Sequence, residues 1–530
     1  MEDWDWLYYS LTITLCLALS MLLSSLRPAT AQLPPGPPAP LLWFIAPLLF
    51  LSRTNSGMDA IIRAARSRYG HIFTLYLHPA RPTIFVVDRA VAHRVLVQSG
   101  AAFADRPPAS LTARVFTSDQ HNISSGAYGP LWSLFRRNLS GRMFHPSCLR
   151  RYAGARRRAL AGLVAGVTQQ MRRDGAVVVE GLLRRAMVHV AVSMCFGEEL
   201  ATDGVVASVE GLYVDFSASV VGFQVFNVCP AATKVVFRRR WKRMLSLRRR
   251  QEELFVPLIR TCRARAQRDG GGVHGGDDSS AAAVVDTYVD TLLGLHIPED
   301  GGRNLKEDEM VTLCFEFLVA ATDTTAAVVQ WIMANLVAQP EIQERLRAEI
   351  EQVAAAGACI EEEHLARMPY LRAVVLEVLR RHPPGHFLLP HAATADTKDA
   401  TLEGFSVPSH ASLNVTLAGM GLDEAVWPDA RRFRPERFLP GGEGAGVDLT
   451  CAKEIKMMPF GAGRRICPGM GLALLHLEYF VANLVAEFEW LQVAGEPVVF
   501  AERQELTVVM QRPFRATVVQ CTRNVNCAGL

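Results

Sequence analysis

The sequence predicts a mainly α-helical protein with a small β-sheet, placed behind one transmembrane helix at its N-terminus. Three observations support this fold class. The first is an uncharged run of 20 residues from Leu7 to Leu26. The second is a pair of short alternating runs, Ile72 to Leu77 and Thr83 to Val87, which are typical of strands. The third is a helical pattern that dominates the chain beyond about residue 130.

The uncharged run is long enough to cross about 30 Å of hydrocarbon as a helix. The residues before it are acidic and the first basic residue, Arg27, follows it. The positive-inside rule therefore places the N-terminus in the lumen and the rest of the chain in the cytosol. A cleaved secretory signal is the alternative, because Ala29-Thr-Ala31 resembles a cleavage site, but such a signal carries positive charge before its apolar run. We expect residues 1–26 to be a retained signal anchor, with a transmembrane helix at about 7–26.

A proline-rich segment, residues 27–40, follows the anchor and contains Leu33-Pro-Pro-Gly-Pro-Pro38. Its prolines restrict φ, which predicts a semi-rigid hinge between the membrane and residues 41–530. By length alone, a chain of 530 residues suggests two or three domains. A glycine-rich stretch at 269–280 has the composition of a flexible loop, and we interpret it as a loop within one domain.

The best-marked helix begins near Asn304-Leu-Lys-Glu307, which resembles a capping box, and ends before Pro340. A helix of that length spans about 50 Å, the width of a whole domain. Because it is also apolar, it is expected to lie in the centre of the molecule. Further helices are predicted at 237–265 and 470–485.

The net charge is only +4, which predicts no affinity for nucleic acid. No GxGxxG sequence follows a predicted strand, so the chain is not expected to bind a dinucleotide itself. Neither observation excludes an enzyme that receives electrons from a partner.

Cys467 is one of eleven cysteines, and it closes the glycine-rich turn Phe460-Gly-Ala-Gly-Arg-Arg-Ile-Cys-Pro-Gly469 before an apolar helix. A helix N-terminus and nearby arginines favour a thiolate, and glycines let backbone N–H groups approach the sulfur. A lone cysteine is by default an inert buried thiol. The spacing of its neighbours favours a metal ligand instead.

Phe460, Gly463, Arg465, Cys467 and Gly469 have the spacing F-x-x-G-x-R-x-C-x-G, which resembles the cytochrome P450 family. Three more motifs resemble that family, in the same order: Ala320-Ala-Thr-Asp-Thr-Thr325, Glu377-Val-Leu-Arg380 and Pro435-Glu-Arg-Phe438. The resemblance covers essentially the whole chain. It implies the cytochrome P450 fold, with residues 41–530 as a single large haem domain, which replaces the length-based expectation of several domains. It also implies that Cys467 is the axial ligand of the iron in haem b.

The resemblance assigns proton delivery to Thr324 and Asp323, halfway along the long helix. Buried polar groups in an apolar helix cost free energy unless they are paired, which favours a function. A threonine in a helix more often bonds its own i−4 carbonyl, so the catalytic interpretation depends on Cys467. The family usually has glycine where this chain has Ala321, and the extra methyl group is expected to narrow the oxygen-binding groove.

Glu377 and Arg380 share one helix face at i, i+3, and with Arg437 they resemble the family's buried structural cluster. The resemblance also implies residues that hold the haem. Contacts to its two propionates are expected from Trp132, Arg136, Arg465, Arg106 and His391, while Phe460 and Gly463 shape the cysteine loop.

The same resemblance implies NADPH–cytochrome P450 reductase as the electron donor, so NADPH acts only through that partner. Arg137, Lys453, Lys456 and Arg464 are expected to form a basic rim that suits an acidic reductase surface, the alternative being a merely solvated rim. The expected location is the endoplasmic reticulum membrane, with a single span and a cytosolic haem domain.

Several phrases resemble the 89A group of plant microsomal cytochromes P450, with the fatty-acid-oxidising 77 group as the rival. They are Phe103-Ala-Asp-Arg-Pro-Pro108, Gln120-His-Asn-Ile-Ser-Ser125, Arg380-Arg-His-Pro-Pro-Gly-His386 and Ile455-Lys-Met-Met-Pro-Phe-Gly461. Oxidation of chlorophyll-derived tetrapyrroles is one activity that the 89A resemblance implies. The chain departs from the usual Gly-Arg-Asp of these relatives, reading Gly421-Leu-Asp423.

The predicted function is monooxygenation of a lipophilic small molecule, by hydroxylation or epoxidation. Its pocket is expected to be lined by residues 107–125, 220–226, 316–320 and 387–389, which are mainly apolar. A redox-neutral isomerase or dehydratase acting on a hydroperoxide is the first alternative, although it has no need of Asp323 and Thr324. A non-catalytic haem-binding membrane protein is a remote second alternative.

Overall fold

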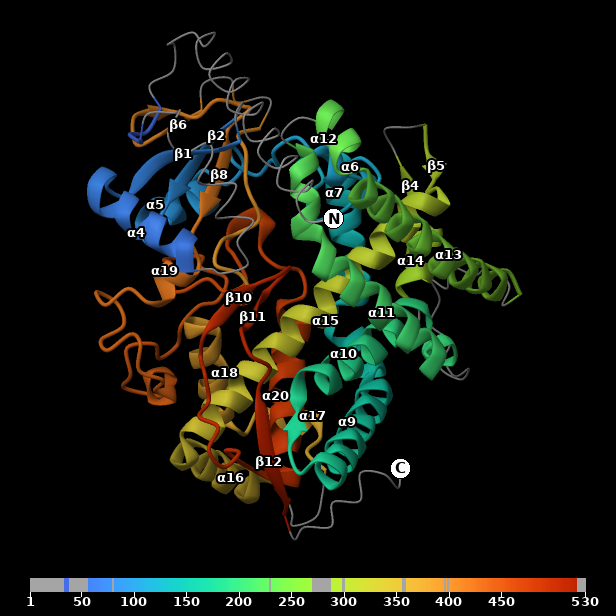
Figure 1. Cartoon of the computed structure of the whole chain (residues 1–530), viewed down its shortest axis with the longest axis vertical. Helices are drawn as coiled ribbons and strands as arrows, with labels where there is room; N and C mark the ends of the chain where they lie inside the picture. Colours follow the sequence, from blue (N-terminus) through green and yellow to red (C-terminus); the bar gives the residue numbers. More distant parts are fainter. Residues whose placement is uncertain are drawn as a thin grey trace.

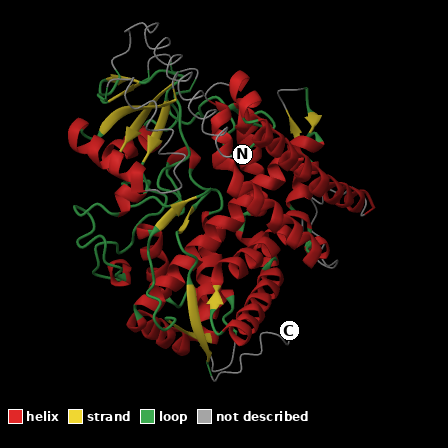
Figure 2. Ribbon diagram, viewed as in Figure 1, coloured by secondary structure: helices red, strands yellow, loops and turns green. Residues whose placement is uncertain are grey.

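The long helix predicted from the sequence is α15 (Glu307–Ala338), which runs through the middle of the molecule (Figure 1). The computed structural model describes residues 33–37, 56–78, 81–227, 230–268, 287–297, 301–354, 359–394, 397 and 400–521. The predicted transmembrane helix at 7–26 and the glycine-rich stretch at 269–280 lie outside these residues. Within them the protein is mainly helical with small sheets, which confirms the predicted fold class (Figure 2).

The helical elements are best given together. They are α4 (Ser56–Tyr69), α5 (Arg89–His93), η1 (Arg94–Gln98), α6 (Leu111–Phe116), α7 (Pro130–Asn138), η2 (Leu139–Met143), α8 (Pro146–Arg151), α9 (Ala153–Asp174), α10 (Val179–Phe196), η3 (Glu198–Leu200), α11 (Asp203–Val220), η4 (Val221–Asn227), α12 (Pro230–Val236), α13 (Arg238–Arg268), α14 (Tyr288–Leu293), α15, α16 (Pro340–Val353), α17 (Glu362–Leu365), α18 (Pro369–Arg381), α19 (Ala418–Gly421), η6 (Pro435–Phe438), η7 (Gly463–Arg465) and α20 (Met470–Glu487). The helices predicted at 237–265 and 470–485 correspond to α13 and α20.

The strands form small separate sheets. They are β1 (Ile72–His78), β2 (Arg81–Val86), β3 (Val177–Val178), β4 (His296–Ile297), β5 (Arg303–Asn304), β6 (Thr401–Leu402), β7 (Phe405–Ser406), β8 (Ser412–Val415), β9 (Phe488–Leu491), β10 (Glu502–Gln504), β11 (Val508–Met510) and β12 (Arg515–Gln520). The two predicted strands are β1 and β2, which pair antiparallel with Thr74 opposite Ile84. The third strand of their sheet, β8, comes from far along the chain and lies parallel to β2. Two other small units matter for the site: the hairpin β10–β11 and the sheet β3–β12–β9.

The start of α15 lies two residues later than the predicted capping box. The backbone N–H of Lys306 donates to the Glu309 carboxylate at 2.8 Å, so Glu309 caps this end in place of Glu307. Arg303 and His121 also bond Glu309, which fixes the first turn against neighbouring segments. At the other end, Pro340 is the first residue of α16, where its missing N–H costs nothing.

Burial of α15 follows from its composition, since most of its side chains are apolar and packed by α10, α13, α18 and α20. Among the described residues, three helical segments are long and apolar enough to span a membrane: Asp203–Asn227, Glu307–Ala338 and Met470–Glu487. The last two are each 72% buried inside the protein, so they are helices of the core. Hydropathy alone would not have separated them from membrane spans.

The described part of the proline-rich hinge, residues 33–37, is tied to the sheet. Thr74 of β1 donates its backbone N–H to Pro35 and its hydroxyl to Pro34, both at 2.9 Å. A side chain at Gly36 would collide with the Thr74 carbonyl oxygen, 2.1 Å from its Cβ position. This end of the hinge is therefore docked on the protein.

Candidate active site

A cavity of about 580 Å³ lies against the middle of α15 and gathers nearly all the predicted site residues. Every one of the predicted catalytic and cofactor-binding residues lines it except Gly463. Glu377, Arg380 and Arg437 lie elsewhere, as expected for a structural cluster. Residues that are up to several hundred positions apart in the sequence thus share one enclosed space.

The loop around Cys467 depends on its glycines. Gly461 and Gly463 have φ values of +74° and +68°, in the left-handed region that favours glycine. A Cβ on Gly463 would lie 1.8 Å from the Leu96 carbonyl oxygen of η1, so only glycine fits there. The Cys467 N–H then donates to the Phe460 carbonyl at 2.8 Å and closes the turn just before α20.

The Cys467 thiol is open to the cavity although protein surrounds it, because its exposed surface faces this enclosed space. Burial raises its pKa, while the N–H of Gly469 and the charge of Arg136 act in the opposite direction. The backbone N–H and the arginine lower the pKa of the free thiol as expected, but burial raises it by more. A metal cation deprotonates a thiol that coordinates it, so a cationic ligand suits this sulfur.

Arg136 of α7, Arg106 and Arg465 bring three guanidinium groups to the same cavity. Burial is the main cause that lowers the pKa of each, to about 9 for Arg106 and about 10 for Arg465. None of the three forms an ion pair with a carboxylate among the residues that the structure describes. Asp105 and Glu316 offset part of this charge at Arg106, and Asp105 does so at Arg465. Three guanidinium groups around one cavity still favour an anionic ligand.

Arg106 and Arg465 also hold the cavity wall through carbonyl oxygens. Arg465 donates to Ala104 and Gly126, both at 2.7 Å, and Arg106 donates to Ser124 at 2.8 Å and Leu389 at 2.7 Å. The segment 122–126 is therefore fastened directly to the cysteine loop.

Two predicted propionate contacts are arranged differently from the expectation. The only N–H of the Trp132 indole is donated to the Ile123 carbonyl at 3.0 Å, and its role as a donor to the cofactor stays a prediction. Its ring instead lies 4.3 Å from the Arg465 guanidinium as a cation–π partner. His391 bonds the Phe103 carbonyl at 2.8 Å, and burial together with Arg106 lowers its pKa to about 3, so this ring is neutral.

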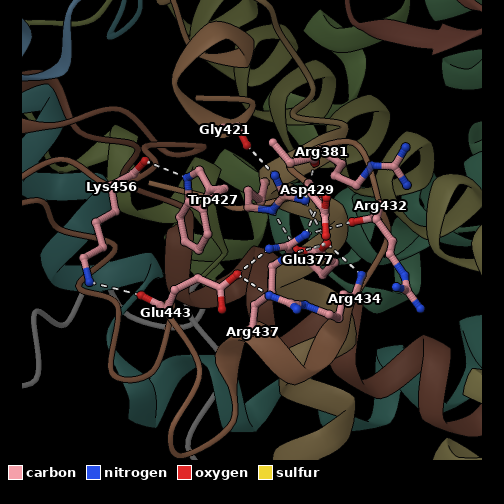
Figure 3. Close-up of polar contacts among 12 residues, drawn as sticks. Glu377, Arg381, Gly421, Trp427, Asp429, Arg432, Arg434, Arg437, Glu443 and Lys456 are labelled. Carbon is pink, nitrogen blue, oxygen red and sulfur yellow. Dashed lines mark hydrogen bonds and ion pairs between the residues drawn. The ribbon is translucent and has the colours of Figure 1, made fainter. Parts of the chain in front are cut away.

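Glu377, Arg380 and Arg437 form a fully enclosed ion cluster behind the cavity (Figure 3). Arg380 bonds both oxygens of Glu377, at 2.7 and 2.8 Å, and Arg437 lies 3.4 Å from the same carboxylate. Sequence reasoning missed Glu443, whose carboxylate accepts from Arg437 on the other side (Figure 3). A glutamate in a loop after the Pro-Glu-Arg-Phe motif carries no local signal of that role.

Thr324 and Asp323 both line the cavity, but they do not bond each other. The Thr324 hydroxyl donates to the Ala320 carbonyl at 2.9 Å, which is the ordinary bond of a helical threonine. Asp323 accepts from Thr507 and Tyr213, two residues that sequence reasoning missed. Burial raises the pKa of Asp323, and these two hydrogen bonds oppose the shift. Ala321 lines the cavity in the same turn of the helix.

Glu316 lies on α15 nearly two turns before Asp323 and binds the segment 122–124. Its carboxylate accepts from the backbone N–H groups of Ile123 at 2.9 Å and Ser124 at 2.7 Å. Sequence reasoning placed Glu316 in the pocket wall but missed this contact. The Ile123 carbonyl of the same segment accepts hydrogen bonds from Arg465 and Trp132. Through this segment, Glu316 connects the central helix to the cysteine loop.

An open thiol, three half-buried guanidinium groups and a central helix with an acid beside a hydroxyl are the features of a haem-thiolate enzyme site. The sequence pattern of the cytochrome P450 family matches residues 34–518, and this chain belongs to that family. It is 43% identical to cytochrome P450 89A9 of Arabidopsis thaliana, over 96% of this chain and 97% of that protein, which bears out the resemblance to the 89A group. It is 28% identical to the flavonoid 3'-monooxygenase CYP75B137 of Crocosmia x crocosmiiflora, with 89% of each chain covered.

Solved structures show the same fold. The retinoic acid-bound cyanobacterial CYP120A1 superposes with a TM-score of 0.73 at 21% identity, covering 93% of this chain and 100% of that one. A zebrafish cytochrome P450 with progesterone gives a TM-score of 0.69 at 23% identity, covering 90% and 99%. The family match and the plant relatives together identify the chain as an oxidoreductase of the cytochrome P450 monooxygenases.

The residues of the cavity fit the haem that this family implies. Cys467 supplies a thiol open to the cavity, and Arg106, Arg136 and Arg465 supply positive charge for two propionates. A Cβ on Gly469 would lie 3.9 Å from the sulfur, in ordinary van der Waals contact, and a Cβ on Gly461 would lie 3.2 Å from the Leu388 side chain.

Proposed function

We propose that this chain is a membrane-anchored haem-thiolate monooxygenase that inserts one atom of dioxygen into a lipophilic small molecule, by hydroxylation or epoxidation. The observation that carries the proposal is the joint position of Cys467, the arginine cluster and the apolar wall around one cavity. Haem bound there supplies oxygen activation, and a thiolate ligand favours O–O cleavage.

The substrate side of the cavity is apolar and aromatic. Phe116, Phe216, Phe315 and Phe387 line it, and Phe116 and Phe216 meet edge to face with ring centroids 5.0 Å apart. An apolar ligand gains free energy by leaving water for such a wall, which supports a lipophilic substrate. The candidates follow from the two resemblances in the sequence: chlorophyll-derived tetrapyrroles from the 89A group, and fatty acids from the rival 77 group.

Thr324 and Asp323 are proposed to carry the protons that oxygen reduction consumes. The Thr324 hydroxyl lies in the cavity wall, and Asp323 lies beside it with a pKa that burial raises above its usual value. A hydroperoxide isomerase has no use for this pair, so the pair favours monooxygenation over that alternative.

Electrons are proposed to come from NADPH through NADPH–cytochrome P450 reductase, docked on the cysteine side. Arg137, Lys453 and Arg464 are exposed, whereas Lys456 is half-buried and donates to the Glu443 carbonyl at 3.2 Å. Arg464 is partly engaged by the Tyr128 hydroxyl at 2.6 Å. Three of the four predicted rim residues are thus available to an acidic surface.

The proposed location is the endoplasmic reticulum membrane, with residues 1–26 as a single-pass anchor, 27–40 as a hinge and 41–530 as a cytosolic haem domain. Asn122 and Asn138, which stand in glycosylation sequons, are buried and hydrogen-bonded. A glycan at either amide is incompatible with these contacts, whereas Asn414 of a third sequon is half-buried. The proposed cytosolic side rests on the charges that flank the N-terminal apolar run.

The test is the carbon monoxide difference spectrum of the reduced microsomal protein, followed by NADPH and oxygen consumption with tetrapyrroles and fatty acids. We expect the Soret shift of thiolate ligation and its loss in Cys467→Ala. Absence of that shift in the wild-type protein would end the proposal. Turnover of hydroperoxides without NADPH would replace it with the isomerase.

A further inference from the structure

The tip of the hairpin β10–β11 reaches the cavity and contacts the acid on α15. Leu506 and Thr507 of this tip line the cavity. Thr507 is 5% exposed, and its hydroxyl donates a short hydrogen bond to the Asp323 carboxylate. Thr507 of the hairpin thus holds one carboxylate oxygen of Asp323 by a hydrogen bond.

A second donor reaches Asp323 from another element. Tyr213 of α11 is buried, and its hydroxyl is hydrogen-bonded to the Asp323 side chain. The Arg184 guanidinium of α10 lies 5.9 Å from the Tyr213 ring centroid and attracts the same carboxylate. Asp323 is therefore held by hydroxyl groups from two elements, and the Thr324 hydroxyl is engaged with the Ala320 carbonyl.

The position of the hairpin tip is itself fixed on both sides. The Val508 N–H donates to the Pro384 carbonyl at 2.8 Å. At the base, Glu502 pairs with His386 at 2.8 Å. Thr507 consequently occupies a defined place between the cavity and Asp323, so the contact is built into the fold rather than left to a free loop.

We propose that Thr507 and Tyr213 are positioning residues that orient the Asp323 carboxyl group for proton transfer toward Thr324. Neither touches the reacting atoms, so they act through Asp323. Without them the carboxyl group is free to turn, and burial favours its protonated form. This inference rests on the proposed function of Asp323 and Thr324.

The consequence is a change in the fate of oxygen. Two electrons and two protons reduce O₂ to hydrogen peroxide, whereas four electrons and four protons reduce it to two molecules of water. NADPH supplies the electrons through the reductase in both cases. Poor proton delivery leaves more oxygen at the peroxide stage, so a misplaced Asp323 raises the yield of peroxide per NADPH.

The experiment uses the full-length protein with reductase in dilauroylphosphatidylcholine vesicles, with no added substrate, and measures hydrogen peroxide per NADPH. We expect Thr507→Val and Tyr213→Phe to raise this ratio at least about threefold, and Thr507→Ser to restore it. Thr517→Val is the matched control, since Thr517 lies in β12 and bonds the Leu491 carbonyl, away from the cavity. The second readout is the infrared band of the protonated Asp323 carboxyl, identified by its loss in Asp323→Asn. We expect its midpoint to move to higher pH in Thr507→Val.

Every outcome decides the proposal. An unchanged peroxide ratio in both Thr507→Val and Tyr213→Phe, or a Thr507→Ser variant that behaves like valine, would overturn it. A carbon monoxide spectrum with thiolate ligation must be present in each variant, which shows that the variant folds and holds haem. If the wild-type protein lacks that spectrum, the proposed function itself fails, and the two failures are thereby distinguished.

Discussion

Cys467 shows how a residue acquires a role from its surroundings. As one cysteine among eleven it has the default of an inert buried thiol. The turn imposed by Gly461 and Gly463 points its exposed surface into the cavity, and Arg136 approaches it from α7. The sequence motif alone predicts this ligand, because the glycines that make the turn are part of the motif.

Glu377→Ala is expected to yield protein without haem. The change leaves Arg380 and Arg437 buried with no carboxylate between them, and breaking a buried pair in this way costs roughly 3–5 kcal/mol. The cluster connects α18 to η6 behind the cavity, so its loss disturbs the site that holds the cofactor. Haem content per protein is the measurement. Glu496→Ala is the control, because its pair with Arg515 is about half exposed and worth at most about 1 kcal/mol. Normal haem content in Glu377→Ala would refute the structural role.

Ala321→Gly is expected to lower the fraction of NADPH lost as hydrogen peroxide. Removing the methyl group widens the cavity beside Thr324, where the family usually has glycine. A glycine in a helix interior lowers the free energy of unfolding by about 1 kcal/mol, so we expect a small fall in melting temperature as well. Ala327→Gly on the same helix, outside the cavity lining, is the control for that fall. If the peroxide fraction equals that of the control, the methyl group of Ala321 does not affect how oxygen is reduced.

At the scale of elements, the three longest-signalled helices, α13, α15 and α20, and the first two strands were predictable because their signals are local. The third strand, β8, was not predicted, because its parallel pairing with β2 joins segments more than 300 residues apart and leaves no local pattern. The start of α15 was misplaced by two residues, since Glu307 and Glu309 both suit a first turn. Thr507, Tyr213 and Glu443 escaped prediction for the same reason as β8: their partners are supplied by tertiary packing.

Glu309→Gln is expected to destabilise the N-terminal end of α15. It is also expected to weaken the dependence of the free energy of unfolding on pH in the acid range. Burial raises the pKa of Glu309, but bonds from Arg303, the Lys306 N–H and His121 outweigh it and lower the pKa to about 2. A carboxylate with a lowered folded-state pKa contributes stability above its unfolded value near 4.5, and this contribution is lost as the pH falls toward 2. The substitution is expected to cost about 2 kcal/mol at neutral pH. Thermal unfolding between pH 2 and 7 measures it.

The outcome for the control completes that test. Glu307, two residues before Glu309, pairs with Arg260 at the surface, so Glu307→Gln is expected to change stability by less than about 1 kcal/mol. Equal effects of the two substitutions would contradict a special role for the buried cap.

At the scale of the whole molecule, the protein has two sides with different tasks. The cavity wall is largely apolar and aromatic. Outside the cavity, Arg137 of α7 and Lys453 and Arg464 of the segment that leads to Cys467 are exposed. The net charge of +4 is too small to create this rim by itself. The proposed docking of an acidic partner therefore depends on the local placement of a few cations.

Charge reversal on this rim is expected to slow electron transfer from the reductase without changing haem content. Arg137→Glu and Lys453→Glu replace attraction by repulsion, which lowers the association rate, and exposed charges act over a Debye length of about 8 Å at physiological salt. The wild-type rate is expected to fall with rising salt, while the rate of the double variant stays nearly flat. Arg172→Glu on α9 changes the net charge without touching the rim, so it separates docking from bulk charge. A wild-type rate that ignores ionic strength would mean that the rim is merely solvated and that apolar contacts bring the reductase to Cys467.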